Sequence, residues 1–140
     1  MDQLQARPDC RPTGRREWIA VVDDDPSIRS SLANLLRSEG ISVETFSAST
    51  DFLAAIASDG PPSCVVLDVH LGTESGFELQ EILAVRHANT PVILMTGHDK
   101  ITSAELSRRA GPDGFLRKPF DGDLILGMVR RRAELLDRPA

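Results

Sequence analysis

Short apolar runs alternate with segments of helical periodicity along most of the chain, and this alternation restricts the fold more than any other feature of the sequence. Three of the runs are apolar throughout, which is typical of strands buried on both faces of a sheet. Strands that alternate with helices in this way form a parallel sheet with right-handed crossovers. The runs cover residues 18–22, 41–46, 64–67, 91–95 and 114–116.

Helical spacing between the runs supports this interpretation. Ile28, Leu32, Leu35 and Leu36 lie on one face of a helix that Gly40 is expected to end. Further helices are predicted around residues 52–56, 79–86 (with Ser75 as N-cap), 100–109 and 124–136, and the third of these has few apolar residues to bury, Ile101, Ala104 and Leu106. Five strand–helix units fit a flavodoxin-like (βα)5 fold with strand order 2-1-3-4-5 and helices on both faces.

The first 17 residues differ in composition from the rest, with Pro8, Pro12, Gly14 and four arginines. We predict a flexible tail over 1–17, with a binding arm as the alternative, a folded domain over 18–137 and a short end at 138–140. With 140 residues, 41 % hydrophobic and 26 % charged, the chain fits one globular domain. Its net charge of −5 argues against sequence-independent nucleic-acid binding, which needs a cationic face.

The sequence has no membrane or export signal that we can identify. No apolar stretch approaches the ~20 residues needed to span a bilayer, and the N-terminus lacks the apolar segment of a signal peptide. The two cysteines, Cys10 and Cys64, are too few for a disulfide framework. We therefore expect a cytoplasmic protein with free thiols and no membrane partner.

Polar residues stand where the predicted strands end. The first strand is followed by Asp23, Asp24 and Asp25. The third strand ends in Asp68, the fourth in Thr96 and the fifth in Lys118. The carboxyl ends of parallel strands meet at one edge of the sheet, where ligands bind in such folds. The sequence therefore predicts an acidic cluster, a hydroxyl and an ammonium around one crevice.

This set of groups suits phosphoryl transfer. Clustered carboxylates repel one another and favour Mg²⁺, which takes carboxylate and phosphate oxygens. A carboxylate is also a nucleophile toward phosphorus, and we assign this role to Asp68, alone at the end of a central strand. Asp23 and Asp24 then hold the metal, while Lys118 and the Thr96 hydroxyl contact phosphoryl oxygens. Asp25 is assigned instead as a charge at the N-terminus of the following helix.

Four stretches resemble the receiver domains of two-component response regulators: VVDDDPSIRSSLANLL, VVLDVHLGTESGFEL, ILMTGH and AGPDGFLRKPF. The resemblance covers about residues 18–137 and is greatest to the FixJ-type subgroup. It implies that Asp68 accepts a phosphoryl group from a sensor histidine kinase or a histidine phosphotransfer protein. It also implies that Asp24, Asp68 and the backbone carbonyl of His70 bind Mg²⁺ (or Mn²⁺), with Asp23 assisting through water.

The same resemblance implies a switch. Thr96 would move toward the phosphoryl group and the Phe115 ring would change rotamer with it, core packing being the alternative role for Phe115. The signal would pass through helix four, strand five and helix five to a downstream protein, and a phosphorylation-dependent dimer through this face is a further expectation. Many receivers have a cis bond between the residues matching Lys118 and Pro119. Because only about 20 residues follow Lys118, we expect a stand-alone receiver without direct DNA binding.

The loop after Asp68 departs from the family pattern. Gly72 stands where many receivers have proline, which predicts a less rigid loop, whereas the family's Gly76 is kept. His70 and His98 flank the expected site, and we expect them to tune hydrolysis of the phosphoryl group. The alternative is that both imidazoles only face solvent.

Other classes of protein fit less well. A haloacid-dehalogenase-like phosphatase needs a second aspartate two positions after the nucleophile, where this chain has His70. A degenerate receiver that signals without phosphate would lack an acidic residue, Thr96 or Lys118, and all are present. A flavin-binding module would need a hydroxyl- and glycine-rich phosphate loop. We therefore expect a switch that catalyses only its own phosphorylation and slow dephosphorylation, and no turnover enzyme.

Overall fold

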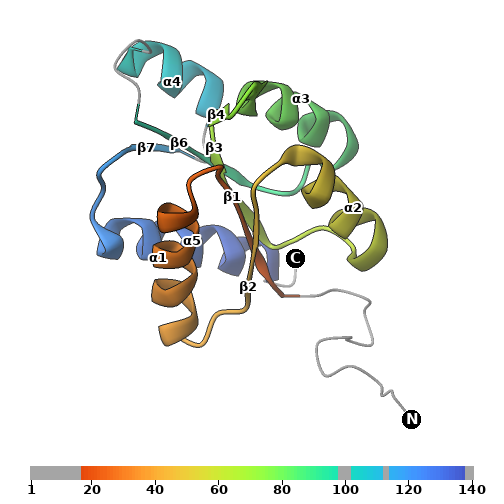
Figure 1. Cartoon of the computed structure of the whole chain (residues 1–140). Helices are drawn as coiled ribbons and strands as arrows, with labels where there is room; N and C mark the ends of the chain where they lie inside the picture. Colours follow the sequence, from red (N-terminus) through yellow and green to blue (C-terminus); the bar gives the residue numbers. More distant parts are fainter. Residues whose placement is uncertain (1–16, 98–101, 112–113, 138–140) are drawn as a thin grey trace.

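The computed structural model describes residues 17–97, 102–111 and 114–137, and they form a parallel sheet between two layers of helices (Figure 1). The sheet has the order β2-β1-β3-β6-β7 and each neighbouring pair is parallel, which confirms the predicted order 2-1-3-4-5. Its strands are β1 (Ile19–Val22), β2 (Val43–Phe46), β3 (Cys64–Asp68), β6 (Val92–Thr96) and β7 (Phe115–Arg117).

Five helices cover the two faces of the sheet: α1 (Pro26–Ser38), α2 (Ser49–Asp59), α3 (Gly76–Arg86), α4 (Ser103–Ala110) and α5 (Gly122–Asp137). Alternate strand residues face opposite layers. Val65 and Leu67 pack with α2, α3 and α4, whereas Cys64 and Val66 pack with α1 and α5. The central strands are thus buried on both sides, as the apolar runs predicted.

Two helix N-termini carry the residues that the sequence predicted there. Asp25 is the N-cap of α1 and accepts a hydrogen bond from the Ser27 amide at 2.9 Å, so its assignment to the helix N-terminus is confirmed. Ser75 caps α3 in the same way through the Phe77 amide at 3.2 Å. In contrast, α2 follows Ala48, which supplies no side-chain cap.

Several details of the sequence prediction were wrong. β2 begins at Val43 and not at residue 41, and Trp18 is buried before β1 begins. Leu124 is 52 % exposed, because the buried face of α5 is formed by Ile125, Leu126 and Val129. The face of α4 differs too: Leu106 and Ala110 are buried while Ala104 is exposed, and Ile101 lies outside the described residues.

A two-stranded antiparallel hairpin follows β3, and the sequence analysis did not predict it. Its strands are β4 (His70–Leu71) and β5 (Glu74–Ser75), with His70 opposite Ser75 and Leu71 opposite Glu74. The turn begins at Gly72, whose φ of +63° favours glycine and excludes proline. The glycine therefore permits a hairpin here, and the expectation of a merely looser loop missed this.

Helix α4 is attached to α3 through its C-terminal end. The Gln80 side chain donates a hydrogen bond to the backbone carbonyl of Arg109 at 2.7 Å. The Arg109 guanidinium also lies over the Phe77 ring, 4.3 Å from its centroid, in a cation–π contact. These contacts join the last turn of α4 to the first turns of α3.

The remaining sequence predictions concern the ends of the chain and its thiols. The predicted tail, apart from Glu17, and the end at 138–140 lie outside the described residues, as does Cys10. Cys64 is buried in β3 and is in no disulfide within the described part of the chain. Among the helices of the described ranges, none has the length and apolar character that crossing a membrane requires.

Candidate functional site

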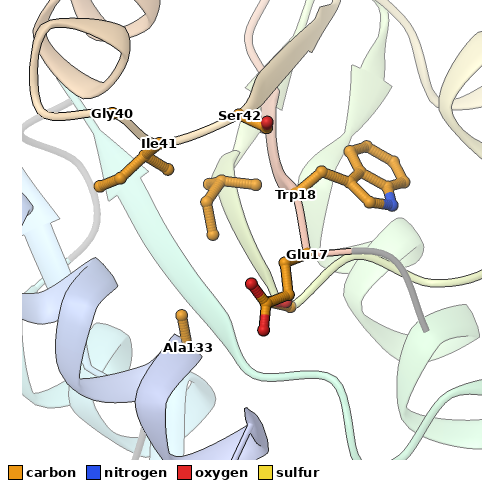
Figure 2. Close-up of a pocket in the computed structure, with 8 residues that line it drawn as sticks. Glu17, Trp18, Gly40, Ile41, Ser42 and Ala133 are labelled. Carbon is orange, nitrogen blue, oxygen red and sulfur yellow. The ribbon is translucent and has the colours of Figure 1, made fainter. Parts of the chain in front are cut away.

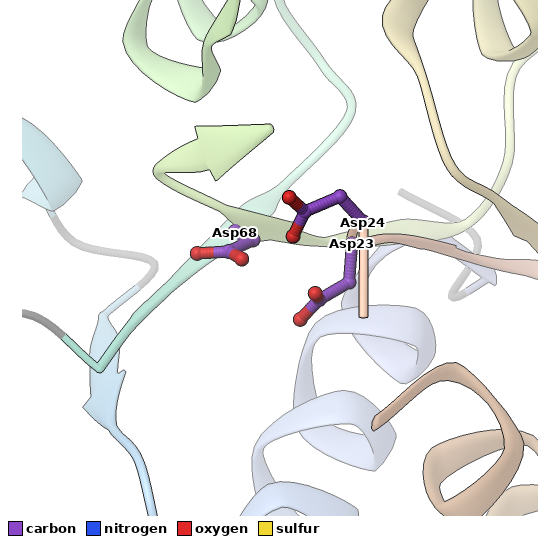
Figure 3. Close-up of side chains that lie close together, drawn as sticks. All are labelled: Asp23, Asp24 and Asp68. Carbon is purple, nitrogen blue, oxygen red and sulfur yellow. The ribbon is translucent and has the colours of Figure 1, made fainter. Parts of the chain in front are cut away.

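Three carboxylates meet at the carboxyl edge of the sheet (Figure 3). β1 and β3 are neighbours, with Val22 opposite Leu67, so Asp23 and Asp24 come out of the sheet beside Asp68. One oxygen from each of the three residues lies within 4.8 Å of the others. Asp23 and Asp68 are buried and Asp24 is exposed. The predicted acidic cluster is thus present, with one open side.

Lys118 reaches this cluster from the far side of the sheet. It follows β7, and its backbone amide donates to the Thr96 carbonyl at 2.7 Å. Its Nζ lies 2.7 Å from Asp23 Oδ2 and 3.1 Å from Asp68 Oδ2. The peptide bond between Lys118 and Pro119 is cis, as the resemblance implied. The ammonium therefore pairs with two of the three carboxylates.

The environment changes the ionisation of both partners. Burial raises the pKa of Asp23 above its usual value, and hydrogen bonds from Lys118 and the Asp25 amide only partly offset this. Burial acts to lower the pKa of Lys118, but its hydrogen bonds and charge interactions with Asp23 and Asp68 outweigh burial and raise that pKa. Lys118 is therefore a permanent cation at neutral pH beside a carboxylate that is costly to ionise.

The backbone that carries the acidic residues is fixed by further hydrogen bonds. Arg29 Nη1 donates to the Asp23 carbonyl at 2.7 Å, and the Asp25 amide donates to Asp23 Oδ1 at 2.9 Å. The exposed Asp24 accepts from the Gly72 amide at 2.9 Å. Sequence reasoning missed the roles of Arg29 and of the Gly72 amide, since neither residue stands at a strand end.

A cavity of about 350 Å³ opens over these groups. Its lining residues are Asp24, Asp25, Asp68, His70, Gly72, Gly97 and Lys118. Buried Thr96 is at the end of β6 but does not line the cavity, and half-buried Phe115 packs against the core on the side of α2, α3 and α4. The structure thus unites Asp68, the metal-ligand candidates and Lys118, and Thr96 is buried at the end of β6, the strand next to β3.

The two predicted tuning histidines differ in what the structure describes. His70 lines the cavity, and its backbone amide donates to Asp68 Oδ1 at 3.2 Å. His98 lies outside the described residues. Whether either imidazole affects hydrolysis stays a prediction.

Gly76 lies directly against the predicted phosphoacceptor. A Cβ at this position would be 2.1 Å from the Asp68 carbonyl oxygen, far below any contact distance. The Gly76 amide also donates to the Val69 carbonyl at 2.8 Å. Only glycine therefore allows α3 to begin this close to the end of β3.

A second cavity of about 290 Å³ lies at the opposite edge of the sheet, where the strands begin (Figure 2). Glu17, Trp18, Ile41 and Ser42 are among its lining residues. It contains none of the predicted site residues. The chemistry thus gathers at the carboxyl edge, as the topology of parallel sheets predicts.

The donor set at the carboxyl edge fits a hard divalent cation. The Lys118 ammonium pairs with two of the three carboxylates, which leaves excess negative charge, and the open side at Asp24 allows coordinated water. Oxygen ligands of this kind suit Mg²⁺, which is bound through one or two carboxylates and keeps several waters. The candidate site is therefore chemically compatible with the expected metal.

Comparison with known proteins defines the class. The family described as the response regulator receiver domain matches residues 19–130, and the chain belongs to this family. Over 115 residues it is 40 % identical to the transcriptional regulatory protein FixJ of Azorhizobium caulinodans, covering 80 % of this chain and 53 % of FixJ. Over 121 residues it is 34 % identical to the response regulator protein TodT of Pseudomonas putida, covering 86 % of this chain and 53 % of TodT. The chain spans about half the length of these relatives.

Solved structures agree with this assignment. A CheY-like receiver domain protein from Methanospirillum hungatei superimposes with a TM-score of 0.76 at 26 % identity, covering 86 % of this chain and 96 % of that one. A response regulator receiver protein from Burkholderia phymatum superimposes with a TM-score of 0.73 at 35 % identity, covering 84 % of this chain and 95 % of that one. Both similarities extend over nearly all of the neighbour's chain, so the fold assignment rests on the complete domain.

Proposed function

We propose that this chain is a phosphorylation switch in which Asp68 accepts a phosphoryl group from the phosphohistidine of a sensor kinase or phosphotransfer protein. The observation that carries the proposal is Lys118, whose ammonium lies within hydrogen-bonding distance of both Asp23 and Asp68. It is placed to pair with a phosphoryl oxygen once one is bound to Asp68. Asp68 is mostly buried but lines the cavity, so a donor has a path to it.

The reaction needs few groups. An Asp68 oxygen attacks phosphorus, the bond between phosphorus and the donor nitrogen breaks, and the imidazole leaves with the electron pair. Asp23, Asp24, Asp68 and the His70 carbonyl would hold Mg²⁺ or Mn²⁺, which supplies positive charge for the phosphoryl oxygens when bound. Lys118 contributes a second positive charge. The product is an acyl phosphate, which we propose the chain hydrolyses only slowly, as a switch and not as a turnover enzyme.

We propose that the response passes from Thr96 and Phe115 to the face formed by α4, β7 and α5, and from there to a downstream protein or a second copy of the chain. Thr96 is buried at the end of β6, next to the strand that ends in Asp68, and we propose that its hydroxyl moves toward the phosphoryl group. Phe115 on β7 is paired opposite Leu94 on β6, the strand that ends in Thr96, so a shift of β6 would act on the strand that carries Phe115. The absence of direct DNA binding stays a prediction, because the relatives are about twice as long as the part matched.

Incubation with acetyl phosphate and Mg²⁺, followed by intact mass, tests the proposal. We expect the wild type to gain the mass of one phosphoryl group and Asp68→Asn to gain none. Asp51→Asn is the matched control, because Asp51 is an exposed carboxylate in the first turn of α2. Labelling of Asp68→Asn at the wild-type level would refute the assignment. Rapid, repeated turnover of the donor would instead indicate the phosphatase alternative.

A further inference from the structure

The β4–β5 hairpin forms one wall of the candidate site and is held at two points. At its turn, the Gly72 amide donates to Asp24 Oδ2 at 2.9 Å. In its second strand, Glu74 Oε1 accepts hydrogen bonds from the Ser49 amide at 3.2 Å and the Ser49 hydroxyl at 2.9 Å. The first contact involves a candidate metal ligand, and the second joins the hairpin to a helix outside the site.

The contact with Ser49 completes the N-terminus of α2. The preceding Ala48 offers no capping side chain, so the first amides of α2 need acceptors from elsewhere. Glu74 supplies a half-buried carboxylate to Ser49, which precedes it by 25 positions, and a negative charge at a helix N-terminus is favourable. The helix itself is fixed on the sheet by Phe52 and Ile56, which are buried. Ser49 is therefore a fixed anchor for Glu74.

Short contacts connect the anchored strand to the reacting carboxylate. Glu74 is paired opposite Leu71, and Ser75 opposite His70, in the hairpin ladder. The His70 amide then donates to Asp68 Oδ1 at 3.2 Å. A displacement of β5 would therefore move the backbone of His70, which carries both this amide and the candidate metal-binding carbonyl.

We infer that Glu74 is a positioning residue for the acidic site. Through Ser49 it fixes the β4–β5 hairpin, which in turn places the His70 backbone and the Gly72 amide beside Asp68 and Asp24. The effect on metal binding rests on the proposed function.

Four variants of the full chain separate this role from simple stabilisation. Glu74→Ala removes the anchor and Glu74→Gln keeps an oxygen acceptor without the charge. Ser49→Ala removes only the hydroxyl bond. Glu81→Ala is the matched control, because it removes an exposed glutamate from the solvent face of α3.

The first measurement is hydrogen exchange of the His70 and Gly72 amides by NMR in metal-free protein. We expect faster exchange in Glu74→Ala, a smaller effect in Ser49→Ala, and near wild-type exchange in Glu74→Gln and Glu81→Ala. Unchanged protection of both amides in Glu74→Ala would overturn the inference.

The second measurement is Mn²⁺ affinity, followed by the loss of the free-ion EPR signal during titration. We expect Glu74→Ala to bind Mn²⁺ about 3–10-fold more weakly, somewhat less than direct partners of metal ligands cost, with recovery in Glu74→Gln. Equal Mn²⁺ affinities of Glu74→Ala and Glu81→Ala would mean that Glu74 only caps α2, and they would overturn the positioning role.

The wild type distinguishes failure of this inference from failure of the proposed function. A wild type that binds neither Mn²⁺ nor a phosphoryl group refutes the function, and the positioning role is refuted with it. A wild type that does both, beside a Glu74→Ala protein equal to the control, refutes the positioning role alone.

Discussion

The ammonium of Lys118 lies 2.7 Å from the Asp23 carboxylate, although 95 positions separate the two residues in the chain. The contact reaches across two intervening strands, β3 and β6, because Asp23 follows β1 and Lys118 follows β7 at the edge of the sheet. It joins a fully buried carboxylate to a side chain that is only 18 % exposed. The pair therefore sets both the charge and the stability of the site.

Lys118→Met should destabilise the protein at pH 7. Asp23 and Asp68 would then be buried beside each other without their cation, which we expect to cost about 3 kcal/mol of unfolding free energy. Urea unfolding of the metal-free protein measures this loss of stability. The control is Arg131→Met, because Arg131 is an exposed cation. Added Mg²⁺ should narrow the difference, and equal stability of the two variants would contradict the prediction.

Asp23 should make the stability of metal-free protein depend on pH. Because burial raises its pKa above the usual value of 3.8, the folded state favours the protonated carboxyl. Its contribution to stability is complete below about pH 4 and is lost as pH rises through the folded-state pKa. Asp23→Asn should therefore be more stable to unfolding than the wild type at pH 7 and should lose this advantage near pH 4. A difference in unfolding free energy between Asp23→Asn and the wild type that stayed constant from pH 4 to pH 7 would contradict this prediction. Asp51→Asn is the control.

Gly76→Ala should be strongly destabilising. The new methyl group would overlap the Asp68 carbonyl oxygen, and relief requires moving α3 or the end of β3. We expect a loss of about 3 kcal/mol or more in thermal or urea unfolding. Gly127→Ala is an instructive control: its Cβ meets only Arg131 Nη1 at 3.8 Å, so better helix propensity should stabilise α5. Similar effects of the two substitutions would refute the steric explanation.

Phosphorylation should alter amide protection in α4 and β7. α4 buries only Leu106 and Ala110 and is the least anchored helix of the proposed output face. Hydrogen exchange with and without beryllofluoride, a phosphoryl mimic, should change over residues 102–111 and 114–117 and remain constant in the middle of α2. If residues 102–117 kept the same protection, the proposed route would be wrong.

The lifetime of the phosphorylated protein should depend on pH between about 6 and 8, since an imidazole with an ordinary pKa of ~6.5 titrates there. His70 lines the cavity beside Asp68. Decay of the phosphorylated form should be measured for wild type, His70→Asn and His98→Ala. We expect a flatter profile when the responsible imidazole is removed, whereas three parallel profiles would mean that both histidines are bystanders.

Elements with strong periodicity could be predicted from the sequence. The runs at 18–22 and 64–67 are apolar because both faces of β1 and β3 are covered by helices. The apolar pattern in the sequence therefore follows directly from burial. Strand order then brought Asp23, Asp68 and Lys118 together, as the structure confirms. What could be predicted was the backbone position of each side chain at the edge of the sheet.

Contacts between loops could not be predicted in this way. Strands of two residues, such as β4 and β5, are too short to carry a period. The contact of Glu74 with Ser49 depends on where α2 lies, and only the folded sheet determines that. Thr96 shows a related difference: its place at the end of β6 was predictable, but its complete burial depends on packing.

The attachment of α4 to α3 at one end makes the helix a lever. Gln80 and Phe77 hold Arg109 in its last turn, whereas its first turn begins at Ser103, after Thr96 in the chain. If Thr96 moves as proposed, a rotation of α4 about Arg109 would preserve the contacts with Gln80 and Phe77, whereas a slide along the sheet would break them. The largest displacement would then fall at the Ser103 end of the helix, and the end that touches α3 would be the pivot.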